Sequence, residues 1–236
     1  MLLDDTPKRA LAVFAHPDDP EVSCAGTLAR WSAAGCESHL VICNAGEKGS
    51  PDASVDPQDL ARLRAEEAAA AAAVMGLAGH EILGYPDGEI ENNLELRGRL
   101  VERIRALRPD VVIAPDPTAV FFGSSYVNHH DHRQVGWAML DAVAPAAANQ
   151  LYFPSAGTRH RVGMMLLAGT LEPDAWVDIE DHLGTKIAAL CCHRSQLTEE
   201  AAVVAEVVRA RAEQAATAAA GGVRWAEGFR YLRFGA

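Results

Sequence analysis

The sequence lacks the features that mark membrane, secreted or nucleic-acid-binding proteins. No apolar run approaches the roughly 18 residues that a membrane span needs. The N-terminus, MLLDDTPKRA, has no basic region followed by a long apolar stretch, so we expect no signal peptide. Basic residues are also scarce, with 21 Lys and Arg against 32 Asp and Glu and a net charge of −11. Because phosphate groups bind to basic surface, we expect neither nucleic acid nor an anionic membrane as the main partner.

Cysteines are few and form no redox or metal-binding motif. The five are Cys24, Cys36, Cys43, Cys191 and Cys192, an odd number without a CxxC spacing. We expect reduced, mostly buried thiols and a cytoplasmic protein. The sequence also lacks GxGxxG after its first apolar run, which argues against a dinucleotide-binding module.

Apolar residues, by contrast, are abundant and regularly placed. They make up 49% of the 236 residues, enough for the core of one sizeable α/β domain. Short apolar runs predict buried strands at 10–15, 39–44, 80–85 and 110–115. Longer helical patterns lie between them, at 20–35, 58–77 and 94–108. This alternation predicts a Rossmann-like three-layer α/β/α fold with a mostly parallel sheet.

The second half of the chain has a weaker pattern. Apolar runs predict strands at 162–169 and 176–179, and the tail, VRWAEGFRYLRF, can add another strand. Helices are predicted at 182–193 and 198–219. No repeat, flexible linker or change of composition divides the chain, so we expect a single domain over residues 1–236.

Polar segments follow each of the first four predicted strands: HPDD, AGEKGS, PDGE and PDP in chain order. Because ligands of α/β sheets bind at the carboxyl ends of the strands, these segments mark the expected site. In the first segment His16 and Asp19 stand three residues apart across a strand-to-helix turn, with Asp18 between them. Pro17 stiffens this turn, and Pro20 favours an extended backbone at Asp19.

A second polar cluster, NHHDHR at 128–133, opens another predicted helix. His129 and His132 are three residues apart and therefore share one face of its first turn. Three His or Asp ligands with an open fourth position form a catalytic zinc site, and one of these histidines can join His16 and Asp19 in that pattern. Each motif alone also has a structural explanation, such as a helix cap or a polar helix start. Capping requires neither two histidines three residues apart nor a histidine three residues before an aspartate. The two motifs together therefore favour a metal site.

Together, AHPDDPE and HHDHR resemble the motifs AHPDDxE and HxDH of the LmbE/PIG-L family of zinc-dependent N-deacetylases, which act on N-acetylglucosamine units. Other segments are similar to the family in the same order: GTLARWSAAG, NAGEKGS, RAEEAAAAAAVMG, LGYPDGEI, IRALRPDVVIAPDP and HRSQ. The resemblance covers nearly the whole chain. The pair of His/Asp motifs is specific, whereas the other segments are weak individually.

The resemblance implies a metal centre and a catalytic apparatus. His16, Asp19 and His132 match the ligands of one Zn²⁺ per chain. Asp18 matches the general base, which takes a proton from the attacking water. His129 matches the histidine that stabilises the oxyanion and can assist the departing amine.

Two neighbouring residues complete the second motif. Asp131 lies between the histidines, and we expect it to orient one of them and to favour a charged His129 through a hydrogen bond. His130 takes the variable position, where the family often has proline, and we expect a spectator rather than a ligand.

Three further residues are expected on the substrate side. Glu47 and Asp87 match family positions near the sugar, and Arg64 in RAEE is a further candidate. The structural alternative for Glu47 and Asp87 is a role in turns. For Arg64 it is a solvent-exposed helix charge paired with Glu67.

The implied function is zinc-dependent hydrolysis of an N-acyl group, in the simplest case acetyl, from an amino sugar in an N-acetylglucosamine-containing conjugate. One alternative is an amidase of the same fold that cleaves a larger acyl group or a thiol conjugate. Another is a non-catalytic Rossmann-like sugar-binding protein. A two-metal phosphohydrolase is disfavoured because few basic residues lie near the motifs. The composition is compatible with a monomer or a closed homo-oligomer, and the role of HRSQ is left open between function and helix capping.

Overall fold

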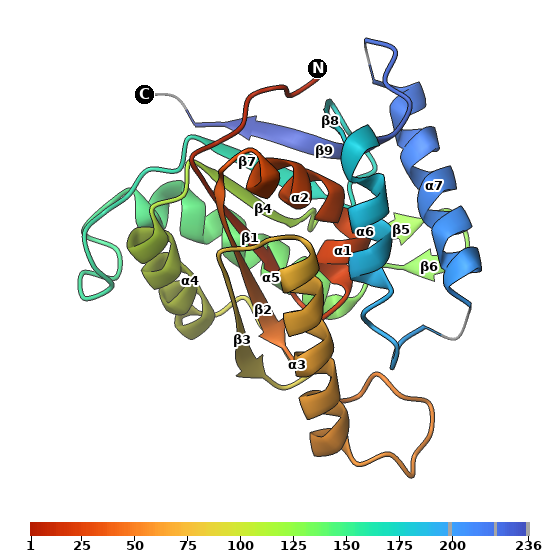
Figure 1. The fold of residues 1–236 in the computed structure, drawn as a ribbon. Coiled ribbons are helices and arrows are strands. Elements are labelled where there is room, and N and C mark those ends of the chain that lie inside the picture. Colours follow the sequence, from red (N-terminus) through yellow and green to blue (C-terminus); the bar gives the residue numbers. More distant parts are fainter. Residues whose placement is uncertain (198–199, 220, 235–236) are drawn as a thin grey trace.

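A sheet runs through the molecule between two layers of helices (Figure 1). The computed structural model describes residues 1–197, 200–219 and 221–234. Within these residues seven strands pair in the order β3-β2-β1-β4-β7-β9-β8. Their bounds are β1 Arg9–Phe14, β2 Glu37–Asn44, β3 Gly79–Tyr85, β4 Val111–Pro115, β7 Met164–Ala168, β8 Ala175–Asp178 and β9 Ala226–Arg233. The first five in this order are parallel, whereas β9 is antiparallel to both of its neighbours. The predicted α/β fold with a mostly parallel sheet is confirmed.

The helices divide between the two faces of the sheet. Their bounds are α1 Asp19–Ser23, α2 Ala25–Ala33, α3 Pro57–Val74, α4 Leu94–Leu107, α5 His130–Asp141, α6 Leu183–Leu190 and α7 Ala201–Thr217. A π-helical turn, η1 Ala142–Ala147, extends α5, and a 3₁₀ turn, η2 Glu180–His182, precedes α6. One core cluster joins the sheet to α2, α3, α6 and α7, and a second joins it to α4, α5 and η1. Among the described residues, no helix combines the length and hydrophobicity of a membrane span.

The central strand β1 explains why the sheet is easy to read in the sequence. Ala10, Ala12 and Phe14 face one core cluster, whereas Leu11 and Val13 face the other. All five are at most 1% exposed. Because both faces of a parallel sheet are covered by helices, its strands are continuous apolar runs. The chain therefore leaves the core only at the end of β1, where the polar turn begins.

Helix boundaries follow local signals where such signals exist. Asp56 caps α3 by accepting from the N–H groups of Gln58 and Asp59, and Pro57 takes the first helical position. Asn93 caps α4 in the same way, accepting from the N–H of Leu96. The predicted helix at 58–77 is thus α3, and the one at 94–108 is α4. Residues 198–199 of the helix predicted at 198–219 lie outside the described residues, and the rest contains α7.

The helix predicted at 20–35 is broken into α1 and α2 at Cys24, whose backbone has φ −148°. The cause is tertiary. The buried carboxylate of Glu227, from β9, accepts from the N–H groups of Gly26 and Thr27 at 3.0 and 2.7 Å. It therefore caps a new helix start from outside the segment. Lys186 donates to the same carboxylate at 2.6 Å and completes this buried cluster.

Between β4 and α5 the chain forms a short hairpin that the sequence did not predict. Its strands are β5 Phe121–Phe122 and β6 Tyr126–Val127. The hairpin leads directly into Asn128 and the N-terminus of α5, so it helps to position the second histidine motif at the sheet edge. The predicted single domain over residues 1–236 stays a prediction.

Candidate metal and catalytic site

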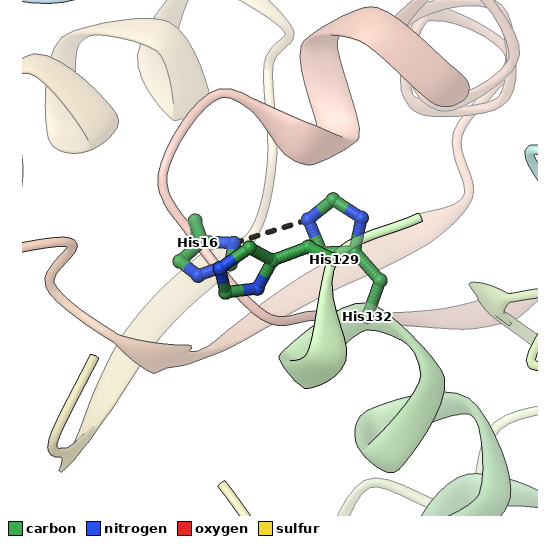
Figure 2. A group of neighbouring side chains, drawn as sticks. All are labelled: His16, His129 and His132. Atoms are coloured by element: carbon green, nitrogen blue, oxygen red, sulfur yellow. Dashed lines mark hydrogen bonds between the residues drawn. The ribbon is translucent and has the colours of Figure 1, made fainter. Parts of the chain in front are cut away.

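The predicted site residues meet at one edge of the sheet, where β1, β2 and β3 end and α5 begins. His16, Asp18 and Asp19 lie where the chain passes from β1 into α1, and His129 and His132 come from the start of α5. Figure 2 shows the three histidines side by side. The other predicted residues lie after β2, after β3, on α3 or on α5: Glu47, Asp87, Arg64 and Asp131. The sheet therefore gathers residues that are more than 100 positions apart in the sequence.

The three predicted metal ligands form a tight triangle. His16 Nδ1 lies 3.1 Å from His132 Nε2. One oxygen of Asp19 lies 3.3 Å from His16 Nδ1, and the other lies 3.0 Å from His132 Nε2. Zinc bonds of about 2.0–2.1 Å in a tetrahedron put neighbouring ligand atoms about 3.3 Å apart. The three separations are close to this value, although each histidine nitrogen faces a different oxygen of Asp19.

A hydrogen bond on the outer side of His132 fixes its tautomer. Asn128 donates from Nδ2 to the carbonyl of Ala119 at 2.8 Å, which orients its amide group. Its Oδ1 then faces His132 Nδ1 at 2.9 Å and accepts the ring proton. A neutral His132 consequently has its lone pair on Nε2, the atom that faces His16 and Asp19.

The other imidazole is oriented in the same manner. His16 Nε2 lies 3.1 Å from Asp87 Oδ1 and donates to this carboxylate. A neutral His16 thus has its lone pair on Nδ1, directed at His132 and Asp19. Two lone pairs and a carboxylate at this separation need a cation between them. Outer hydrogen bonds of this kind are also typical of metal-binding histidines.

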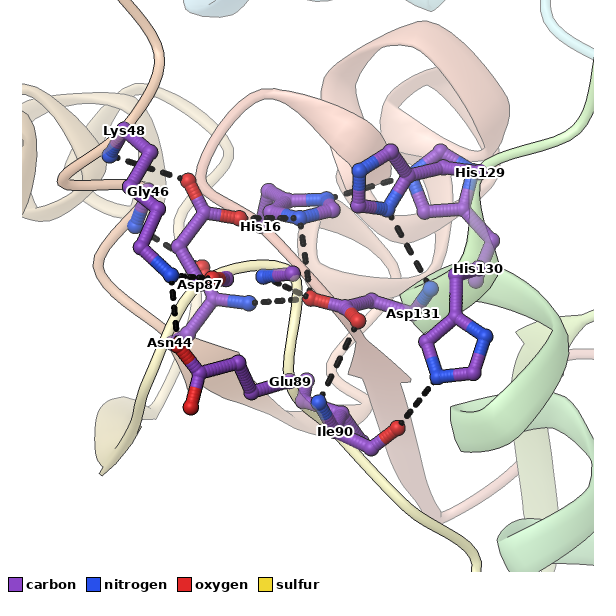
Figure 3. A network of polar contacts seen from close by, with 12 residues as sticks. His16, Asn44, Gly46, Lys48, Asp87, Glu89, Ile90, His129, His130 and Asp131 are labelled. Atoms are coloured by element: carbon purple, nitrogen blue, oxygen red, sulfur yellow. Dashed lines mark hydrogen bonds and ion pairs between the residues drawn. The ribbon is translucent and has the colours of Figure 1, made fainter.

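Other groups of donor atoms are also close. Donor atoms lie within 4.8 Å of one another in two further sets of three: His16, His129 and His132, and His16, Asp87 and Asp131. The carboxylates of the second set already accept N–H groups (Figure 3), Asp131 from Asn44, Gly88 and Ile90, and Asp87 from Lys48. In the first set, His129 Nδ1 accepts from the N–H of Asp131. Asp19 Oδ2 also accepts from the N–H of His16 at 2.8 Å. The triangle with Asp19 still fits a metal best, because the lone pairs of His16 Nδ1, His132 Nε2 and Asp19 Oδ1 face one another.

The carboxylates around His16 favour positive charge at this point. Burial by itself lowers the pKa of His16, but the contacts with Asp131, Asp19 and Asp87 outweigh it and raise the pKa to about 12. Burial would raise the pKa of Asp19, whereas the charges and hydrogen bonds of His132 and His16 lower it well below its usual range. Surroundings that hold a proton this strongly also attract a metal cation.

Asp18 stands beside this triangle in a strained turn. Its backbone has φ 91° and ψ −30°, a conformation that costs a non-glycine residue about 1–3 kcal/mol. Burial and the neighbouring charge of Asp19 raise the pKa of Asp18 to about 6, against the opposing charge of Arg64. Strain and a raised pKa at one carboxylate are typical of functional sites.

His129 is the N-cap of α5, and its ring centroid lies 4.7 Å from that of His16. Its Nδ1 accepts from the backbone N–H of Asp131 at 3.2 Å, so a neutral His129 carries its proton on Nε2. Burial and then the positive charge of His16 lower the pKa of His129. The structure thus favours a neutral ring that donates from Nε2, rather than the charged ring that we expected.

The predicted hydrogen bond from the Asp131 carboxylate to His129 is wrong. The fully buried carboxylate faces His16 instead, with Oδ2 at 3.5 Å from Nε2. The reason is geometric: at the start of α5 the backbone N–H of Asp131 points to the His129 ring, while its side chain points into the sheet edge. Asp131 therefore contacts His129 through its backbone N–H and His16 through its carboxylate. His130 points away from the triangle and contacts the carbonyl of Ile90 at 2.9 Å (Figure 3).

The residues expected on the substrate side have several partners within the protein. Glu47 is half-buried and accepts from the N–H of Asp87 at 2.8 Å. Asp87 itself contacts His16 and the N–H of Lys48. Arg64 is 3% exposed, so it is not the solvent-exposed helix charge of the structural alternative. The predicted partner of that alternative, Glu67, accepts from Ser195.

Sequence reasoning missed the residues that orient the ligands. Asn128 stands four positions before His132 at a helix start, a spacing that puts its side chain within reach of that ring. Asn44, the last residue of β2, donates to Asp131 at 3.1 Å. Only Asn128 could have been found from the sequence, through its spacing to His132. The partner of Asn44 is 87 residues away.

Comparison with known proteins identifies the family. A family model described as PIG-L, GlcNAc-PI de-N-acetylase, matches residues 11–143, more than half of the chain. The chain belongs to the PIG-L family. The matched part contains most of β1, all of β2 to β4 and α5, and all three corners of the metal triangle.

Two relatives of this chain are named as deacetylases of N-acetylated sugars. Diacetylchitobiose deacetylase of Thermococcus kodakarensis is 29% identical over 196 residues, 82% of this chain and 72% of the relative. The 1D-myo-inositol 2-acetamido-2-deoxy-alpha-D-glucopyranoside deacetylase of Kineococcus radiotolerans is 31% identical over 176 residues, 61% of this chain but 47% of the relative. This chain thus spans about half the length of the second relative.

A solved structure extends the similarity to nearly the whole fold. N,N'-diacetylchitobiose deacetylase from Pyrococcus horikoshii superposes with a TM-score of 0.85 and 29% identity, covering 96% of this chain and 84% of that one. The predicted family and the prediction of an enzyme are therefore confirmed: relatives in the PIG-L family are amide hydrolases that act on C–N bonds other than peptide bonds.

Proposed function

We propose that this PIG-L protein is a zinc-dependent N-deacetylase that removes an acyl group, in the simplest case acetyl, from an amino sugar in an N-acetylglucosamine-containing conjugate. The observation that carries the proposal is the triangle of His16 Nδ1, His132 Nε2 and the Asp19 carboxylate, with outer hydrogen bonds that leave lone pairs inside it. The deacetylase activities of relatives support the reaction type.

The donor set fits zinc in its chemistry. Two imidazoles and one carboxylate are three ligands of the types found in catalytic zinc sites, which keep the fourth position for water or substrate. When bound, zinc polarises a carbonyl group and lowers the pKa of water to about 7. His16, Asp19 and His132 would hold one ion per chain.

Asp18 is the proposed general base. It is adjacent to Asp19 in the same turn, and its carboxylate contacts Arg64 rather than the triangle. A base must lie near the attacking water without being occupied as a ligand. Asp18 therefore takes the proton of the water and can later release it to the departing amine.

His129 is the proposed donor to the oxyanion. Its Nε2–H is free of the hydrogen bond that occupies Nδ1, and the ring stands next to that of His16. A neutral donor is sufficient here, and one such hydrogen bond is typically worth ~3 kcal/mol in the transition state. The proton for the departing amine comes from Asp18, which took it from the water, or from His129 in its charged form, which the lowered pKa of that ring disfavours.

Glu47 and Asp87 are the proposed contacts for sugar hydroxyl groups, beside the role of Asp87 in orienting His16. Glu47 uses Oε1 to hold the loop that carries Asp87, which leaves its second oxygen for substrate. Carboxylates of this kind accept hydrogen bonds from hydroxyl groups and select sugars over apolar amides.

A substrate panel tests the proposal most directly. Purified protein should contain about one zinc per chain and release acetate from N-acetylated amino sugars, with rates that depend on the aglycone. Faster release of longer carboxylates from matched N-acyl sugars would favour the amidase alternative. Metal-free protein that binds these sugars without hydrolysing them would favour the non-catalytic alternative.

A further inference from the structure

The strained backbone of Asp18 needs a structural cause. Its φ of 91° is unusual for a residue with a side chain, and Pro17 before it and Pro20 after Asp19 restrict the turn further. Asp18 is nevertheless the N-cap of α1 without a side-chain capping bond. The capping bond that is usual for an aspartate at this position is therefore missing. Within the turn, Asp19 Oδ2 accepts from the N–H of His16 at 2.8 Å, and a further contact comes from outside it.

Arg64 of α3 makes that contact. One guanidinium nitrogen, NH2, donates to the carbonyl of Pro17 at 2.7 Å and lies 3.4 Å from Asp18 Oδ2. The other, NH1, donates to the carbonyl of Gly46 at 3.0 Å. The side chain is only 4% exposed. Arg64 thus joins the turn after β1 to the loop after β2.

The loop after β2 is shaped to admit this guanidinium group. A Cβ atom on Gly46 or on Gly49 would lie 2.3 Å from Arg64 NH1, closer than any real side chain tolerates. Gly46 also has φ 66°, whereas Gly49 has no such backbone requirement. Gly49 is therefore open to alanine as far as its own backbone is concerned, and the space beside it is needed by Arg64.

The helix that carries Arg64 is anchored one turn further on. Glu67 accepts from both the N–H and the hydroxyl of Ser195, at 2.8 and 2.6 Å. Glu67 is 8% exposed, so this is a buried contact. Ser195 belongs to the HRSQ segment, whose role the sequence left open. The segment fixes α3 at the turn next to Arg64.

We propose that Arg64 is a positioning residue for Asp18: its fork of donors holds the turn of residues 16–19 in the conformation in which the carboxylate of Asp18 faces the substrate. The inference rests on the proposed function in that Asp18 is taken as the base. It differs from the role in substrate binding that the sequence predicted for Arg64, and the two roles affect different kinetic constants.

Three variants test the proposal with the N-acetylated amino sugar that the wild type hydrolyses fastest. Arg64→Ala is expected to lower kcat about 100-fold, the cost of a misplaced catalytic group, with KM nearly unchanged and zinc content intact. Low-millimolar guanidinium should restore part of kcat in Arg64→Ala. Arg64→Lys keeps the charge but loses the fork and should stay impaired.

Gly49→Ala leaves Arg64 in the sequence but occupies its space, so kcat should fall by less, because the guanidinium group can shift. Gly184→Ala on α6, where a Cβ meets nothing within 4 Å, is the matched control and should behave as the wild type. A raised KM with unchanged kcat in Arg64→Ala would overturn the proposal in favour of substrate binding. Wild-type kcat in both Arg64→Lys and Gly49→Ala would also overturn it.

A crystal structure of Arg64→Ala separates this proposal from the proposed function. Relaxation of Asp18 to a negative φ supports positioning by Arg64, whether or not the wild type releases acetate. An Asp18 that keeps its φ of 91° without Arg64 overturns the positioning role. Absence of acetate release by the wild type, in contrast, would count against the proposed function alone.

Discussion

Replacing Asn128 with alanine is expected to weaken zinc binding although it leaves all three ligands in place. Asn128 is 6% exposed and accepts the Nδ1 proton of His132 at 2.9 Å. Without this acceptor, the ring can carry its proton on Nε2, and that tautomer cannot bind a metal. Loss of such an outer partner costs about 10- to 100-fold in metal affinity, which corresponds to about 1.4–2.7 kcal/mol.

The assay is a zinc competition experiment. Protein stripped of metal is titrated against a chromophoric zinc chelator, and the dissociation constant is compared between variants. Asn128→Asp is the informative control, because it keeps an acceptor for His132 but loses the Nδ2 donor to the carbonyl of Ala119. If the tautomer of His132 decides the affinity, Asn128→Asp should bind zinc at least as tightly as the wild type, and Asn128→Ala should not.

Two results would refute this reasoning. Equal zinc affinity in Asn128→Ala and the wild type would show that the outer hydrogen bond does not matter for binding. Equal losses in the two variants would assign the effect to the Ala119 contact, and so to local structure. Thermal unfolding of the metal-free proteins, followed by circular dichroism, checks that both variants are folded during the titration.

Asp18→Asn should lower kcat at least about 100-fold, because it removes the proposed base, with zinc content unchanged; hydrolysis at the wild-type rate would disprove the assignment. His129→Ala should lower kcat about 100- to 1000-fold with little change in KM, because the donor acts on the transition state; steady-state kinetics separate the two constants. Glu227→Ala should lower the free energy of unfolding by about 3–5 kcal/mol, because the buried Lys186 loses its charged partner and keeps the carbonyl of Val22; urea unfolding measures this, with the exposed Glu213→Ala as control. Chelation should abolish acetate release and lower Tm, and added zinc should restore both, since a ligand of the native state stabilises it by mass action.

Much of the fold could be predicted because the central strands are buried on both faces. Apart from the exposed Asp110 at its start, the run at 110–115 is apolar and buried, as is the run at 10–15, so both can be recognised as strands without tertiary information. The chain order of strands and helices then leaves few topologies. The position of β9 between β7 and β8 could not be predicted from the chain order. An antiparallel strand at the edge of a sheet can pair with any strand whose backbone N–H and C=O groups the parallel strands leave free.

The break between α1 and α2 illustrates a signal that is absent from the local sequence. Residues 20–35 have one continuous helical pattern. Glu227, about 200 residues away, supplies the cap that starts a second helix. Helix propensity is a weak preference, and the hydrogen bonds to the buried carboxylate of Glu227 outweigh it here.

Residue types and their spacing in AHPDDPE and HHDHR are local properties, so the sequence alone was enough to predict which side chains meet at the sheet edge. Their orientation depends on the rest of the fold. The fold turned the Asp131 carboxylate to His16 instead of His129, buried Arg64 in contact with Asp18, and gave His132 a partner in Asn128. The physical reason is that a side chain forms its hydrogen bonds with whatever groups folding places around it, and in this site most of those groups come from other strands and helices.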